Sequence, residues 1–129
     1  MRIEDYFQQI RQILEGSPLI SSFDVAYDKR STHTGFIRGE IYFVNGSILH
    51  LREFVDVEIM VERLAYSYQY MGPSKTLVFR YDNTGHHKKL NLPTYPHHKH
   101  LQEGRGVIAS AAPDLGIVIN EIEASIQLP

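Results

Sequence analysis

The two ends of the chain have apolar residues at intervals of three or four positions, which place them on one face of a helix. Near the N-terminus these positions are Ile3, Tyr6, Phe7, Ile10, Ile13 and Leu14, and near the C-terminus they are Leu115, Val118, Ile119, Ile122 and Ile126. Glu4 and Asp5 favour the positive end of the first helix, and Gly16-Ser17-Pro18 ends it. Pro113 and Asp114 suit the first turn of the second. We predict an amphipathic helix at each end.

The middle of the chain alternates with a period of two residues, which is typical of strands. Phe36–Val44 and Ser47–Val55 flank Asn45-Gly46, and Asn-Gly is the favoured two-residue hairpin turn because both central positions need a positive φ. Three further strands are predicted, at Phe23–Tyr27, from Leu64 through Tyr66, Tyr68 and Tyr70, and at Lys75–Asp82. Asp56–Glu62 fits neither period and is either a helical turn or a connection. The whole pattern predicts an α+β fold with a mainly antiparallel sheet of about five strands.

The length and composition indicate one globular domain. A chain of 129 residues is most simply a single domain, here residues 1–129. Hydrophobic residues make up 43% and charged residues 22%, which argues against disorder and fibrous repeats. Without cysteine, disulfides and zinc–thiolate sites are excluded, whereas histidine and carboxylate sites are not. The first residues hold acids and no apolar core of signal-peptide or membrane-span length, so we expect a cytoplasmic protein with no membrane partner.

The charge is distributed unevenly along the chain. Residues 72–106 contain six Lys and Arg and two acidic residues, which gives this segment a charge of +4. Because the net charge of the whole chain is −2, the other residues together carry −6. A basic field favours a polyanionic partner such as RNA or a phosphate, which the acidic remainder would repel. A solvated basic loop without a ligand explains the same charges equally well.

The candidate chemistry gathers in Phe79–Leu101, which holds five of the seven histidines. Alternation along the preceding strand places Arg80 and Asp82 on one side, where an arginine fork can bind a phosphate and the carboxylate can orient it or polarise a histidine. A surface ion pair is the alternative interpretation. Glu53 is a further candidate, because it interrupts an apolar row.

Histidine is the usual proton donor and acceptor in RNA cleavage, where a 2′-hydroxyl loses a proton and a 5′-oxygen gains one. The candidates are His86, His87, His97, His98 and His100. In an extended segment the last two would point to one side, which also suits a metal with Asp82. For any single histidine, a solvated loop residue without a role is the more common explanation.

Several ordered blocks resemble one known family. Phe79-Arg80-Tyr81-Asp82-Asn83, His86-His87 and Pro96-His97-His98-Lys99-His100-Leu101 resemble the TumE family of toxin components from prokaryotic toxin–antitoxin systems. Leu49–Phe54 and Tyr66–Tyr70 are similar to the same family, so the resemblance covers most of residues 47–125. Gly85 stands where family members often have a proline. The resemblance implies a small cytoplasmic toxin whose partner is a cognate antitoxin, and it supplies no catalytic residues.

Residue chemistry then gives the working hypothesis of a metal-independent ribonuclease without a cofactor. In this hypothesis His97 or His98 acts with His100 in proton transfer and Asp82 or Glu53 orients a histidine. The residues expected to contact phosphate or base are Arg80, Lys99, Tyr68, His86 and His87. A non-enzymatic module that docks the antitoxin through its basic segment is one alternative. A metal-dependent hydrolase using His98, His100 and Asp82 is another, and a homo-oligomer stays open.

Overall fold

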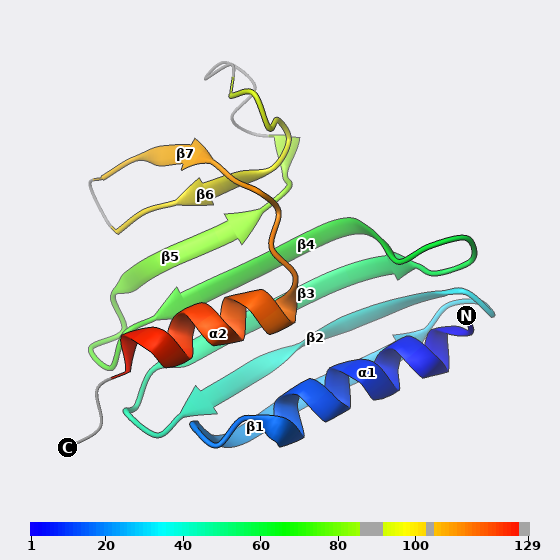
Figure 1. The fold of residues 1–129 in the computed structure, drawn as a ribbon, viewed down its shortest axis with the longest axis horizontal. Coiled ribbons are helices and arrows are strands. Elements are labelled where there is room, and N and C mark those ends of the chain that lie inside the picture. Colours follow the sequence, from blue (N-terminus) through cyan, green and yellow to red (C-terminus); the bar gives the residue numbers. More distant parts are fainter. Residues whose placement is uncertain (86–91, 103–104, 127–129) are drawn as a thin grey trace.

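A computed structural model describes residues 1–85, 92–102 and 105–126, which form one sheet with two helices packed against it (Figure 1). The elements in chain order are α1 Ile3–Gly16, β1 Ile20–Lys29, β2 Thr34–Phe43, β3 Ile48–Asp56, β4 Glu62–Met71, β5 Leu77–Asp82, β6 His98–His100, β7 Val107–Ala109 and α2 Leu115–Ser125. The strands lie in the order β1 to β7, and every neighbouring pair is antiparallel. The α+β prediction is confirmed.

The described sheet has seven strands rather than the expected five. The additional strands are β6 and β7, which have three residues each and extend the sheet beyond β5. Three residues are too few to show an alternating pattern, so only pairing with a neighbour identifies them as strands. In the segment Asp56–Glu62, which fitted neither period, Asp56 ends β3, Glu62 begins β4, and the residues between them form a connection.

Both helices cover the same face of the sheet (Figure 1). Their buried residues are Ile3, Tyr6, Phe7, Ile10 and Leu14 on α1, and Leu115, Val118, Ile119 and Ile122 on α2. α1 ends at Gly16 as the sequence indicates. α2 is capped by Asp114, whose side chain accepts a hydrogen bond from the Ile117 N–H at 3.0 Å, so Pro113 precedes the cap instead of lying in the first turn. Within the described part of the chain, neither helix is long and apolar enough to span a membrane.

The hairpin between β2 and β3 forms as predicted, but with a different turn. Gly46 donates its N–H to the Phe43 carbonyl at 3.0 Å, and Phe43 donates to the Ser47 carbonyl at 2.9 Å. Of Asn45 and Gly46 only the glycine has a positive φ, of 86°. This is a three-residue connection with glycine in the left-handed position rather than the two-residue turn that we expected.

The alternation of the strands divides the polar residues between two environments. Leu51, Glu53 and Tyr68 point toward the helices and are buried. Arg52, Ser67 and Arg80 point to the opposite face, which no described helix covers. We call this uncovered surface the open face. The candidate site lies at one end of it, where β5 pairs with β6.

Candidate active site

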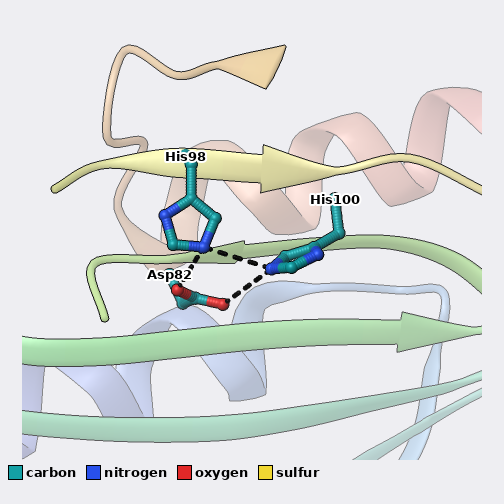
Figure 2. Close-up of side chains that lie close together, drawn as sticks. All are labelled: Asp82, His98 and His100. Carbon is teal, nitrogen blue, oxygen red and sulfur yellow. Dashed lines mark hydrogen bonds and ion pairs between the residues drawn. The ribbon is translucent and has the colours of Figure 1, made fainter. Parts of the chain in front are cut away.

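Asp82, His98 and His100 form one cluster on the open face (Figure 2). The antiparallel register places Asp82 opposite His98 and Arg80 opposite His100, so all four side chains project from the same side of the sheet. Asp82 Oδ1 lies 2.7 Å from His98 Nε2, and Asp82 Oδ2 lies 3.4 Å from His100 Nε2. The two histidine Nε2 atoms are 3.1 Å apart. One carboxylate therefore contacts both rings, while the rings contact each other.

The Asp82 side chain is 1% exposed and accepts several hydrogen bonds. The Thr84 N–H and hydroxyl donate to Oδ1 at 3.1 and 2.9 Å, and Arg80 Nε donates to Oδ2 at 2.8 Å. Burial by itself raises the pKa of the Asp82 carboxyl, but the Thr84 and Arg80 hydrogen bonds and the charge of His98 outweigh it and lower this pKa below its ordinary value. Asp82 is therefore an anion held in place at the base of the cluster.

The orientation of the His98 ring is fixed by the backbone before β6. Its Nδ1 lies 2.9 Å from the Pro96 carbonyl oxygen, which can only accept, so Nδ1 carries the hydrogen. The Nε2 atom then points to Asp82 and His100. Asp82 Oδ1, His98 Nε2 and His100 Nε2 can each accept a hydrogen bond, and their lone pairs would repel one another if none of the atoms carried a hydrogen. At least one of the two Nε2 atoms therefore donates a hydrogen bond within the cluster.

Access to solvent differs among the members of the cluster. The side chains of Asp82 and His98 are 1% and 2% exposed, whereas those of His100 and Arg80 are 26% and 36% exposed. Arg80 is also held from a second strand, because its Nη1 donates to the Gln69 side-chain oxygen at 3.2 Å. His100 and Arg80 are therefore the groups that a substrate on the open face can reach.

Lys99 lies on the opposite side of β6, as its position between two histidines that point to the open face requires. Its Nζ is 3.1 Å from Glu121 Oε2 on α2 and 4.8 Å from the centre of the Tyr81 ring. The structure therefore does not bring Lys99 to Arg80, and the expectation that the two hold one phosphate loses its geometric basis.

Glu53 and Tyr68 lie on the helix-covered face, within the core. Glu53 is 1% exposed, and its carboxylate accepts hydrogen bonds from the hydroxyls of Tyr6 and Tyr68, the latter at 2.6 Å. Arg63 donates to the Tyr68 hydroxyl at 3.1 Å and to the Pro113 carbonyl at 2.9 Å. The sheet separates these groups from the histidine cluster. Their contacts indicate a structural network between α1, the sheet and the start of α2.

His97 is also separated from the cluster, because its ring points to the side of Tyr66. The Tyr66 hydroxyl lies 2.9 Å from His97 Nδ1, and the two rings stack with centroids 5.8 Å apart. Burial, together with the charges of Arg63 and His98, lowers the pKa of His97. A neutral His97 ring can accept the hydrogen of the Tyr66 hydroxyl, and by stacking on the Tyr66 ring it covers the core at this edge of the sheet.

Of the candidate residues named from the sequence, the structure brings together Arg80, Asp82, His98 and His100. His86 and His87 lie outside the described residues. Three positioning groups were not identified from the sequence: Thr84, Gln69 and the Pro96 carbonyl. The turn-forming residues Asn83-Thr84-Gly85 after β5 could have drawn attention to Thr84. Gln69 could not be identified because its role depends on strand pairing, nor could the Pro96 carbonyl, because it is a backbone group.

The same cluster is the described group that offers ligand atoms for a metal. The ligand atoms of Asp82, His98 and His100 all lie within 4.8 Å of one another, and the bond from His98 Nδ1 to a carbonyl is typical of metal-binding histidines. The Arg80 guanidinium opposes this use, because its charge lies 2.8 Å from Asp82 Oδ2 and would repel a divalent cation. Asp82 Oδ1 is also already occupied by two bonds from Thr84.

Comparison with known proteins gives one result. A family model described as toxin TumE matches residues 9–126, which is nearly the whole chain. No curated protein and no solved structure matches the chain. The match includes the second half of α1, all the described strands and α2, and therefore the strands that carry the histidine cluster.

Proposed function

The chain belongs to the TumE toxin family, and from this premise we propose that it acts on RNA as a metal-independent ribonuclease. Membership identifies it as a toxin component of a toxin–antitoxin system, with an antitoxin as its partner. The reaction and the substrate are our proposal, and they rest on the chemistry of the open face.

One observation carries the proposal: the buried Asp82 carboxylate contacts both His98 and His100 and is bonded to Arg80. Histidine is the side chain used most often for general acid–base catalysis, and here two histidines contact one carboxylate. An arginine at the same carboxylate supplies a fork for a phosphate. Phosphate binding and proton transfer are thus available at one place.

In the proposed reaction Arg80 holds the phosphate that will be cleaved. His100 takes the proton of the 2′-hydroxyl, the 2′-oxygen attacks phosphorus, and the bond from phosphorus to the 5′-oxygen breaks. The histidine pair returns a proton to the leaving 5′-oxygen, which gives a 2′,3′-cyclic phosphate and a 5′-hydroxyl. Asp82 stabilises the positive charge that develops on the two histidines. His98, which contacts both Asp82 and His100, holds the His100 ring in position.

The test is cleavage of RNA by the purified protein in EDTA. Replacing His100 by Ala should lower the rate by about 10²–10⁴-fold, the usual contribution of a proton-transfer residue. Arg80→Lys should also lower it, because a point charge cannot reproduce the fork that bonds to Asp82 and Gln69. His33→Ala is the matched control. His33 contacts the Met1 carbonyl and lies in the connection between β1 and β2, at the other end of the strand order from β5 and β6. Wild-type protein that cleaves no RNA, or full activity in the His100 variant, contradicts the proposal.

The convergence of three metal-ligand atoms favours a metal-dependent hydrolase as a second candidate. In that case EDTA abolishes cleavage, a divalent transition metal restores it, and Arg80→Gln raises metal affinity by removing the neighbouring positive charge. Protein that is inert towards RNA with and without metal, but loses its antitoxin when the cluster is changed, supports the docking-module alternative.

A further inference from the structure

The open face also contains an aromatic pocket beside Arg80. Its cavity measures about 180 Å³ and is lined by residues from β2 to β5 and the turn after β5, among them Phe36, Arg52, Phe54, Ser67 and Arg80. Phe36 and Phe54 are cross-strand partners with ring centroids 6.3 Å apart. The pocket is therefore lined by two aromatic rings and two guanidinium groups, with Ser67, Asn83 and Thr84 among its polar residues.

Both phenylalanines are only partly buried, on a face that no described helix covers. Partly exposed aromatic rings at this position contribute less to the core than the inward-facing residues Ile37 and Val55 next to them, which are fully buried. Arg52 lies 5.9 Å above the Phe36 ring and, in the described part of the chain, has no acidic partner within 4.0 Å. A ring surface beside an unneutralised guanidinium is what a nucleotide requires, namely a plane for its base and a cation for its phosphate.

We propose that this pocket binds the base of a nucleotide next to the phosphate held by Arg80, with Phe36 and Phe54 stacking against the base and Arg52 contacting the backbone. The inference rests on the proposed action on RNA and specifies a single-stranded substrate, since a base in a duplex cannot enter a pocket. Phe36, Phe54 and Arg52 are then binding residues of the toxin and lie outside its proton-transfer cluster.

The spacing of the strands agrees with this placement. Arg52 is opposite Ser67, and Ser67 is opposite Asp82, so two strand intervals of ~4.8 Å, or roughly 10 Å, separate the backbone at Arg52 from that at Asp82. Such a separation suits neighbouring nucleotides. Asp24 on β1 and Glu40 on β2 are opposite each other on the open face and would repel phosphate. The bound strand should therefore lie over the part of the sheet from Phe36 of β2 to β6, away from Asp24 and Glu40.

The experiment measures binding rather than cleavage, so that it is independent of the reaction. In a His100→Ala background, fluorescence anisotropy gives the Kd for a labelled single-stranded RNA, with Phe54→Ala, Phe54→Leu and Arg52→Ala as variants. Loss of one stacked base should raise Kd by about 5- to 150-fold. Phe54→Leu keeps the apolar volume and the fold but should also weaken binding. Phe23→Ala and Arg11→Ala are matched controls, because Phe23 is 40% exposed outside the pocket and Arg11 lies on α1.

An RNA of the same length with abasic positions separates base stacking from charge. We expect the wild-type pocket to bind this probe weakly and the Phe54 variants to lose no further affinity on it. The inference about the pocket is overturned if wild-type and Phe54→Leu protein have equal Kd, or if the Phe54 variants lose as much affinity for abasic RNA as for normal RNA. Either result leaves the ribonuclease proposal standing. Base-dependent binding by a protein that never cleaves RNA supports the pocket and refutes the ribonuclease, and absence of RNA binding refutes the pocket.

Discussion

Glu53 offers a sharp test of the division between core and site, because its sequence pattern made it a catalytic candidate and the fold places it among buried tyrosines. We expect Glu53→Ala to destabilise the protein strongly and Glu53→Gln to have little effect at acidic pH. Alanine removes the acceptor of two buried hydroxyls, those of Tyr6 and Tyr68. Each unsatisfied hydroxyl costs about 1–3 kcal/mol, so together they cost about 2–6 kcal/mol. That is a large part of the ~5–15 kcal/mol that stabilises a domain.

Glutamine has the same shape and keeps one acceptor oxygen, so its effect depends on the ionisation of Glu53. Burial raises the pKa of Glu53 and outweighs the hydrogen bonds from Tyr6 and Tyr68. For an acid with a raised folded-state pKa, the stabilising contribution is complete below its unfolded pKa and falls as the pH rises through the folded value. Glutamine does not titrate. The stability of Glu53→Gln relative to wild type should therefore increase from about pH 4 towards neutrality.

The assay is urea unfolding of wild type and both variants at several pH values, followed by RNA cleavage at a pH where the variant is folded. Cleavage by Glu53→Gln should stay close to wild type, because the sheet separates this side chain from His98 and His100. Equal destabilisation by Ala and Gln at every pH refutes the hydrogen-bond reasoning. A fall in cleavage of about 10²-fold or more in folded Glu53→Gln would return Glu53 to the catalytic centre.

Three further outcomes test other parts of the structure. Asp82→Asn should cost about 3–5 kcal/mol at neutral pH; because the pKa of Asp82 is lowered, this difference should shrink as the pH falls below about 4, as acid titration of urea midpoints would show. Gly39→Ala should cost about 1–3 kcal/mol or more in urea unfolding, since its Cβ would lie 2.2 Å from the Asp24 carbonyl oxygen. Asp114→Ala should cost about 0.5–2 kcal/mol and lower Tm, because the N-cap bond to Ile117 is lost.

The elements with a long, regular pattern could be predicted from the amino-acid sequence alone. Both amphipathic helices and the long hairpin of β2 and β3 follow from periodicity and from the Asn-Gly pair, and the pairing of Arg80 with Asp82 follows from simple alternation. These features depend on neighbours within a few residues, and their signals therefore lie within one short window of the sequence.

Only the tertiary structure decided which candidates share a surface. Glu53 and Asp82 are both buried acids on strands, but their side chains point to opposite faces of the sheet. Glu53 therefore lies in the core under the helices, whereas Asp82 contacts the histidines on the open face. Likewise, His98 and His100 became a pair and Lys99 was turned to α2 only because a three-residue strand pairs with β5 in one register. A shift by one residue would reverse all three, and long-range pairing, which no local pattern encodes, fixes that register.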